Sequence, residues 1–165
     1  TIGKPLGNGH PVAAVACTRE VAEKFANGME FFNTFGGNPV SCAIAQEVLD
    51  VVREEKLQDN ARRTGQFLKE ELRHLAQKFP IIGSVRGEGL FLGIELVDNH
   101  LNPLKKEADY LVNRMKDFGF LMSTDGPDQN VIKIKPPIIF DKNHASQLVF
   151  YLKKVLHSCA LSLHF

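Results

Sequence analysis

Lys4 stands in a loop whose residue types could support covalent chemistry. The loop has the sequence Thr1-Ile2-Gly3-Lys4-Pro5-Leu6-Gly7-Asn8-Gly9-His10-Pro11, which is too rich in Gly and Pro for a helix or a central strand. A lysine amine condenses with an aldehyde to form a Schiff base, and once displaced it can act as a base. The glycines let the backbone approach a flat molecule closely. The alternative is an ordinary loop on which the lysine is a surface charge.

A second segment offers donors for a phosphate. It is Asn33-Thr34-Phe35-Gly36-Gly37-Asn38-Pro39, which places a hydroxyl and backbone amides beside the start of a helix. We predict Asn38 as the N-cap and Pro39 as the first helical residue, so that the helix dipole favours an anion nearby. Thr34 is the candidate phosphate ligand. The alternative is a turn in which Gly36 and Gly37 only permit tight geometry.

The two segments together predict a pyridoxal phosphate site, because that cofactor needs a lysine for its aldehyde and donors for its phosphate. Lys4 is therefore the candidate catalytic and cofactor-binding residue, and Thr34 the second cofactor-binding residue. Arg86 is a candidate for contact with a substrate or a partner chain, or for a structural salt bridge. Lys133 and Lys135 are expected on one face of a short strand, where they form an exposed pair or meet an anionic substrate.

Composition excludes several classes of protein. With 20 basic and 19 acidic residues, we expect no attraction to nucleic acid or an anionic membrane surface. No apolar run approaches the roughly 18 residues that span a bilayer. Three cysteines without CxxC spacing and six scattered histidines predict reduced thiols of an intracellular protein and no metal site. The cysteines are Cys17, Cys42 and Cys159.

Hydrophobic periodicity and turn residues predict the order of helices and strands. The prediction is a strand at 12–17, a helix at 18–26, a loop at 29–38, and a helix from 40 continuing as a long amphipathic helix at 57–79. Strand-like segments follow at 80–89 and 90–97, then a helix at 105–118, strands at 120–123 and 131–134 around a turn at 124–127, and a final helix at 141–156 capped by Asp141. The last residues are expected to form a frayed tail.

The later half is thus expected to be βαββα, an α+β domain. One strand and two helices make no core of their own, so residues 1–79 are predicted to be the end of a larger α/β domain plus a connecting helix, and 80–165 the smaller domain.

Four motifs in order resemble one family. They are Gly3-Lys4-Pro5-Leu6-Gly7-Asn8-Gly9, Asn33-Thr34-Phe35-Gly36-Gly37-Asn38-Pro39, Val85-Arg86-Gly87-Glu88-Gly89-Leu90 and Pro136-Pro137. The sequence is similar to the class III (subgroup II) pyridoxal phosphate aminotransferases, which include ornithine and alanine–glyoxylate aminotransferases. The resemblance implies the C-terminal portion of a fold-type I transferase, with Lys4 in the Schiff base. It also implies a homodimer or higher homo-oligomer, in which Thr34 reaches the cofactor phosphate of the neighbouring subunit.

Within that family the chain looks most like a branch of phospho-lyases that act on phosphoethanolamine or 5-phosphohydroxylysine. The similarity lies in residues 121–127 and 130–137. Lys133 stands where many relatives have an arginine that clamps the substrate carboxylate, and lysine replaces a bidentate clamp poorly. We therefore expect elimination of phosphate to give an aldehyde and ammonia, with Lys133 near the substrate. The alternatives are a class III aminotransferase and a catalytically silent fragment.

The resemblance also implies parts that are not found in this sequence. These are an upstream phosphate-binding turn, an aromatic ring that stacks on the cofactor, and an aspartate that pairs with the pyridine nitrogen. They would precede Thr1, so we expect the isolated chain to have little or no activity. The expected compartment of the whole protein is the cytoplasm or the mitochondrial matrix.

Overall fold

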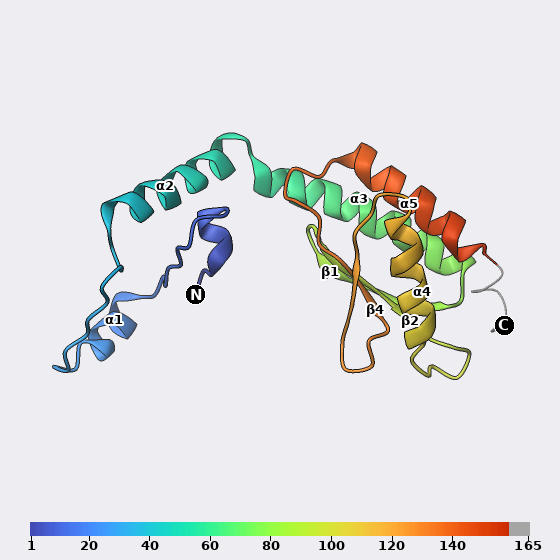
Figure 1. Ribbon diagram of the computed structural model, residues 1–165, viewed down its shortest axis with the longest axis horizontal. Coiled ribbons are helices and arrows are strands. Elements are labelled where there is room, and N and C mark those ends of the chain that lie inside the picture. Colours follow the sequence, from blue (N-terminus) through green and yellow to red (C-terminus); the bar gives the residue numbers. More distant parts are fainter. Residues whose placement is uncertain (159–165) are drawn as a thin grey trace. The chain divides into compact units, whose positions relative to one another are not determined.

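The computed structural model describes residues 1–158, and these fall into two compact units (Figure 1). The first unit is Thr1–Lys56 and the second begins at Leu57. The expected C-terminal tail and Cys159 lie outside the described residues.

The first unit contains one short 3₁₀ helix and two α-helices. They are η1 (Lys4–Gly7), α1 (Arg19–Phe25) and α2 (Pro39–Glu54). The strand expected at 12–17 is wrong: the backbone there makes a single antiparallel bridge, between Ile2 and Ala14, with N···O distances of 2.7 and 2.9 Å. A strand requires a partner over several residues, and Ile2 supplies only one such contact before the chain enters η1.

The start of α2 follows the prediction. Asn38 is the N-cap, its side-chain oxygen accepts a hydrogen bond from the Ser41 backbone N–H at 2.9 Å, and Pro39 is the first helical residue. The helix does not run on into the next one. Lys56 has a φ of 53°, a left-handed conformation that ends a helix, so α2 and α3 (Leu57–Lys78) are separate.

The second unit is α3 followed by a four-stranded sheet and two more helices. The elements are β1 (Ile82–Glu88), β2 (Phe91–Leu96), α4 (Lys105–Lys116), β3 (Ser123–Asp125), β4 (Val131–Ile134) and α5 (Lys142–Leu156). The strand order is β1-β2-β4-β3, and every neighbouring pair is antiparallel. The predicted order βαββα therefore lacked one strand, since β1 and β2 are two arms of a hairpin closed at Gly89, whose φ is 53°.

Strand β3 begins later than predicted, and its turn is displaced with it. Ser123 pairs with Lys133 and Asp125 with Val131, so residues assigned to the turn at 124–127 are partly strand. The preceding Phe120 and Met122 pack against the core instead. Pairing with β4 sets these bounds, and local sequence does not contain that information.

The core lies on one face of the sheet, where α3, α4 and α5 cover it (Figure 1). Alternate residues of β2 and β4 point into it, because successive side chains on a strand face opposite sides. These are Leu92, Ile94, Leu96, Ile132 and Ile134. The predicted apolar face of α3 is confirmed, since Leu68, Leu72 and Leu75 are buried. By its contacts α3 groups with the sheet. The division of the whole protein's domains at 79/80 stays a prediction.

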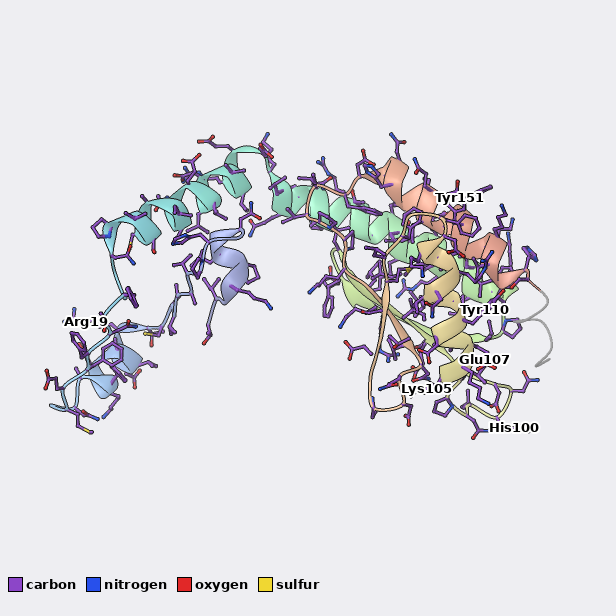
Figure 2. The ribbon with its side chains drawn as sticks, in the orientation of Figure 1. Arg19, His100, Lys105, Glu107, Tyr110 and Tyr151 are labelled. Atoms are coloured by element: carbon purple, nitrogen blue, oxygen red, sulfur yellow. The ribbon has the colours of Figure 1, made fainter. Side chains whose placement is uncertain are left out.

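A cap and a ring contact fix the last helix of the second unit, and Asn60 binds the segment that precedes it. Asp141 caps α5 as predicted, accepting from the His144 backbone N–H at 2.9 Å. On α5 the Tyr151 ring, labelled in Figure 2, stacks on Phe118 with 4.7 Å between ring centroids. The Asn60 amide of α3 donates to the backbone carbonyl oxygens of Ile138 and Phe140 at 2.8 and 3.0 Å. The segment between β4 and α5 is therefore bound to α3.

Candidate functional site

Lys4 is the first residue of η1 and is exposed. Behind it Leu6 and Gly7 are buried. A Cβ on Gly7 would lie 2.8 Å from a methyl carbon of Val12, so the loop packs closely on itself at that point. Within residues 1–158 the Lys4 amine makes no ion pair or hydrogen bond. Its position leaves the amine available for an aldehyde.

A side-chain network joins the Lys4 loop to the start of α2. His10 Nε2 lies 2.8 Å from Ser41 Oγ, and the Asn38 amide donates to the same hydroxyl at 3.0 Å. Asn38 also donates to the Phe35 carbonyl oxygen at 2.7 Å. Sequence analysis did not identify His10 or Ser41, which are 31 residues apart and follow no spacing rule. The network holds the two predicted cofactor segments together within the first unit.

Thr34 is exposed, and its hydroxyl has no hydrogen-bond partner in the part of the chain that the structure describes. The sequence predicted that the backbone amides beside Thr34 would help to bind phosphate, but two of them already have a partner. Asn33 Oδ1 accepts from the backbone N–H of Phe35 at 3.2 Å and of Gly36 at 2.9 Å, so these two donors are engaged. A Cβ on Gly36 would lie 2.9 Å from Asn33 Cγ. Gly36 therefore serves the turn, as the alternative interpretation had it, and the role of Thr34 stays a prediction.

These residues fit part of a pyridoxal phosphate site. The first unit presents one accessible amine at Lys4 and one accessible hydroxyl at Thr34. Such groups suit an aldehyde and a phosphate oxygen, respectively.

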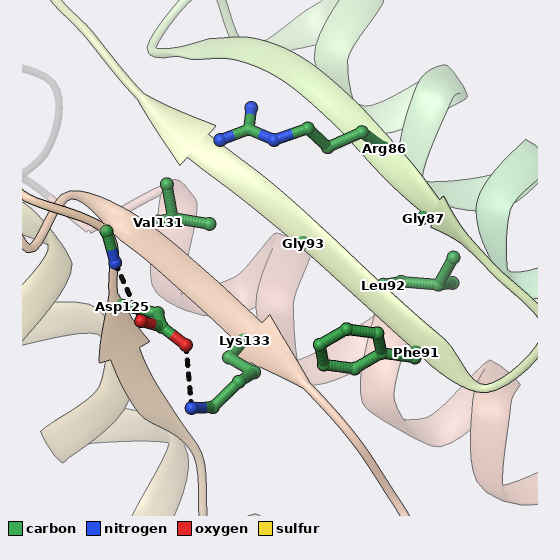
Figure 3. A pocket seen from close by; sticks show the side chains of 9 residues that line it. Arg86, Gly87, Phe91, Leu92, Gly93, Asp125, Val131 and Lys133 are labelled. Carbon is green, nitrogen blue, oxygen red and sulfur yellow. Dashed lines mark hydrogen bonds and ion pairs between the residues drawn. The ribbon is translucent and has the colours of Figure 1, made fainter. Parts of the chain in front are cut away.

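Lys133 lies on the face of the sheet opposite to the one that α3, α4 and α5 cover. The strand register places Arg86 of β1, Gly93 of β2 and Lys133 of β4 in one row across three strands. Figure 3 shows this row along a pocket of about 370 Å³. Its lining includes Arg86, Phe91, Gly93, Asp125, Val131 and Lys133. Gly93 adds no side chain between the two cations, and a Cβ there would lie 3.1 Å from a methyl carbon of Val131.

Both cations of this pocket have carboxylate partners. Lys133 Nζ lies 2.7 Å from Asp125 Oδ2, and Arg86 Nη1 lies 2.5 Å from Glu95 Oε2. The hydrogen bond from Lys133 lowers the pKa of Asp125 below its usual value, and the hydrogen bond from Arg86 lowers the pKa of Glu95. Arg86 therefore forms a structural salt bridge, which was the alternative given for this residue. For Lys133 the sequence predicted an exposed residue or one that meets an anionic substrate. Its side chain is only 33% exposed, and its Asp125 partner was not foreseen.

Within residues 1–158 no group of three or more His, Cys, Asp or Glu side chains is placed to hold a metal ion. In the same range no helix is both long enough and apolar enough to cross a membrane.

The sequence and fold match known proteins over most of the chain. The model of the class-III aminotransferase family matches residues 1–156. A Drosophila melanogaster protein named alanine–glyoxylate aminotransferase 2-like is 50% identical over 94% of this chain and 32% of its own length. A Caenorhabditis elegans protein named ethanolamine-phosphate phospho-lyase homolog 1 is 43% identical over 94% of this chain and 34% of its own length. Relatives from Arabidopsis thaliana and Homo sapiens have "mitochondrial" in their names.

Among solved structures, a phospholyase from Arthrobacter in complex with phosphoethanolamine superposes with a TM-score of 0.90. It is 41% identical, and the match covers 94% of this chain and 37% of that one. The chain belongs to the class-III aminotransferase family. Its fold is that of part of a fold-type I pyridoxal phosphate transferase, and the chain spans about a third of the length of the curated relatives it matches.

Proposed function

We propose that the full-length protein carrying this sequence is a pyridoxal-phosphate-dependent phospho-lyase. Its substrate is a phosphorylated amine, phosphoethanolamine or 5-phosphohydroxylysine, and with water it yields an aldehyde, ammonia and phosphate. The observation that carries the proposal is the similarity, at a TM-score of 0.90 over 94% of the chain, to a phospholyase bound to phosphoethanolamine. Lysine at position 133, already paired with Asp125, also favours a substrate that needs no carboxylate clamp.

In this proposal Lys4 holds the cofactor through its amine and Thr34 binds the cofactor phosphate across a subunit boundary. When bound, pyridoxal phosphate supplies an electron sink for negative charge on the carbon that bears the substrate amine. Lys4 Nζ, once released, accepts the proton from that carbon. The bond from the adjacent carbon to the phosphate oxygen then breaks, and phosphate leaves with the electron pair.

A class III aminotransferase is the second candidate. The Drosophila melanogaster relative, which is 50% identical, has an aminotransferase name. Both reactions need Lys4 as the base, so the residues described above serve either one. They differ in whether a good leaving group sits next to the carbon that loses the proton.

The deciding experiment uses the full-length protein with cofactor. We expect phosphate release from phosphoethanolamine or 5-phosphohydroxylysine without any keto acid. Strict dependence on a keto acid, with no phosphate release, would identify the aminotransferase instead. Lys4→Ala should abolish both the cofactor absorbance band and turnover. Lys24→Ala, an exposed lysine in the last turn of α1, is the matched control and should retain both.

The proposal extends to assembly and compartment. A homodimer or higher homo-oligomer is required if Thr34 serves the neighbouring subunit, and light scattering on the full-length protein tests this. We place the protein in the mitochondrial matrix or the cytoplasm, which localisation of a tagged full-length protein would distinguish. The isolated 165 residues should show little or no turnover when cofactor is added, and robust turnover would overturn that expectation.

A further inference from the structure

The pocket on the open face of the sheet holds cations that are already neutralised. Arg86 is paired with Glu95 and Lys133 with Asp125, so the four formal charges of this region sum to zero. An anion that enters must compete with a carboxylate for either cation. Phe91 and Val131 supply apolar wall beside the pairs. Neither of these two cations is therefore free to pair with a further carboxylate without giving up its present partner.

Asp125 is held by contacts with both a side chain and the backbone. Its Oδ2 accepts from Lys133 at 2.7 Å, and its Oδ1 accepts from the Gly126 backbone N–H at 2.8 Å (Figure 3). Both oxygens are therefore engaged. Asp125 ends strand β3, and its backbone is held in register opposite Val131.

The strand positions Lys133 beside this partner. Its backbone is paired on both sides, with Gly93 of β2 and Ser123 of β3, and its side chain is 33% exposed. The pair is therefore formed before any substrate arrives. A carboxylate brought to Lys133 would gain only part of the lysine charge and would be repelled by Asp125.

We propose that Asp125 is a specificity-determining residue, which holds Lys133 in an ion pair and so disfavours substrates with a carboxylate on the carbon that bears the amine. The inference rests on the proposed function, since it takes Lys133 to lie beside the substrate. It names the substrate class of that site: phosphorylated amines in which the carbon that bears the reacting amine has no carboxylate.

The test compares two substrates that differ by one carboxylate, phosphoethanolamine and O-phospho-L-serine. Both can lose phosphate by the same elimination, so phosphate release reports on both. In the full-length holoenzyme, Asp125→Asn should lower the preference for phosphoethanolamine, measured as the ratio of kcat/KM values, by about fivefold. The change should lie mainly in KM for O-phospho-L-serine, because the variant alters binding of the carboxylate.

Two further variants separate the pair from other causes. Asp128→Asn removes a charge from the same turn without touching the Lys133 pair, and should leave the ratio unchanged. Asp125→Glu keeps a negative charge beside Lys133 and should retain most of the preference. An unchanged or increased preference in Asp125→Asn, an equal effect of Asp128→Asn, or an equal effect of Asp125→Glu would each overturn the inference.

If Asp125→Asn does not fold, Asp125→Ser is read in the same way. Failure of the proposed function gives a different result, in which the unaltered protein releases phosphate from none of phosphoethanolamine, 5-phosphohydroxylysine and O-phospho-L-serine.

Discussion

The two units of this chain differ in how much apolar surface they bury. Among residues 1–56, all of which the structure describes, Leu6 is the only large apolar side chain that is buried, and α1 and α2 bury none. The second unit has a continuous core from α3 to α5. The sheet and its three helices therefore stabilise one another, whereas the first unit leaves Phe31, Phe32 and Phe35 largely exposed.

The difference shows where each kind of functional residue can be positioned. Lys4 and Thr34 lie on loops whose geometry depends on a few hydrogen bonds, such as that between His10 and Ser41. Lys133 lies on a strand paired on both sides, in front of a buried core. Within this chain we therefore expect substitutions to cost stability mainly in the second unit, and three pairs of variants test that expectation. A fourth pair compares two ion pairs within the second unit.

The largest effect should come from the core. Leu72→Ala removes a fully buried side chain of α3 and should lower the free energy of unfolding by about 2–5 kcal/mol. Phe32→Ala removes a larger side chain that is 78% exposed and should leave that free energy nearly unchanged. Urea denaturation of the chain followed by circular dichroism measures both. Equal losses would show that the first unit has a core of its own.

A close backbone approach gives the second comparison. Alanine normally stabilises a helix relative to glycine, but a Cβ on Gly65 of α3 would lie 2.0 Å from the Gly89 carbonyl oxygen. Gly65→Ala should therefore destabilise the second unit by about 1–3 kcal/mol. Gly3→Ala in the first unit, whose Cβ would lie 3.9 Å from Pro5 Cδ, should be close to neutral. A stabilising Gly65→Ala would contradict the packing of α3 on the hairpin.

The two helix caps form a matched pair. Asp141 and Asn38 each accept a backbone N–H at 2.9 Å. Because α5 is part of the core, Asp141→Ala should lower the unfolding free energy of the second unit by about 1 kcal/mol. Asn38→Ala should instead loosen the first turn of α2 alone. Amide hydrogen exchange, measured residue by residue, separates these outcomes. A loss of protection throughout the sheet in Asn38→Ala would contradict the expectation that this cap affects α2 alone.

The smallest effect should come from the Arg86–Glu95 pair on the open face. Its carboxylate side chain is 33% exposed, so Glu95→Gln should cost at most about 1 kcal/mol. The pKa of Glu95 is lowered in the folded state. Its contribution is therefore present above the ordinary glutamate pKa and is lost as the pH falls through the lowered value.

Urea denaturation at pH 7 and at pH 3 measures this contribution to the free energy of unfolding. The gap between Glu95→Gln and the unaltered chain should narrow at the lower pH. Asp59→Asn breaks the Arg62–Asp59 pair, which is exposed on both sides at 3.2 Å, and should have less effect. A gap that widens on acidification would have the wrong sign for a carboxylate with a lowered pKa.

Local signals predicted the parts of the fold that depend on neighbouring residues. The starts of α2 and α5 were placed at the correct residue, since an Asn or Asp cap needs only the next three residues. The strand at 12–17 and the bounds of β3 were wrong, because a strand exists only where a partner strand pairs with it. Residues 80–97 were predicted to have strand character, but the expected order βαββα counted them as one strand. The structure has two strands there, β1 and β2.

The candidate site was also predictable only in part: its reactive residues were identified from the sequence, but their partners were not. Residue identity alone singled out Lys4, Thr34 and Lys133, since an amine and a hydroxyl have the same chemistry wherever the chain places them. Their partners were not foreseen: Asn33 takes two of the amides expected to bind phosphate.

Sequence by itself determined the family motifs, the caps and the chemical groups available in each unit. Only the tertiary structure decided that Lys133 faces the open side of the sheet and meets Asp125, eight residues away. The physical reason is that strand register selects which alternate side chains share a face and which charges lie within reach of one another.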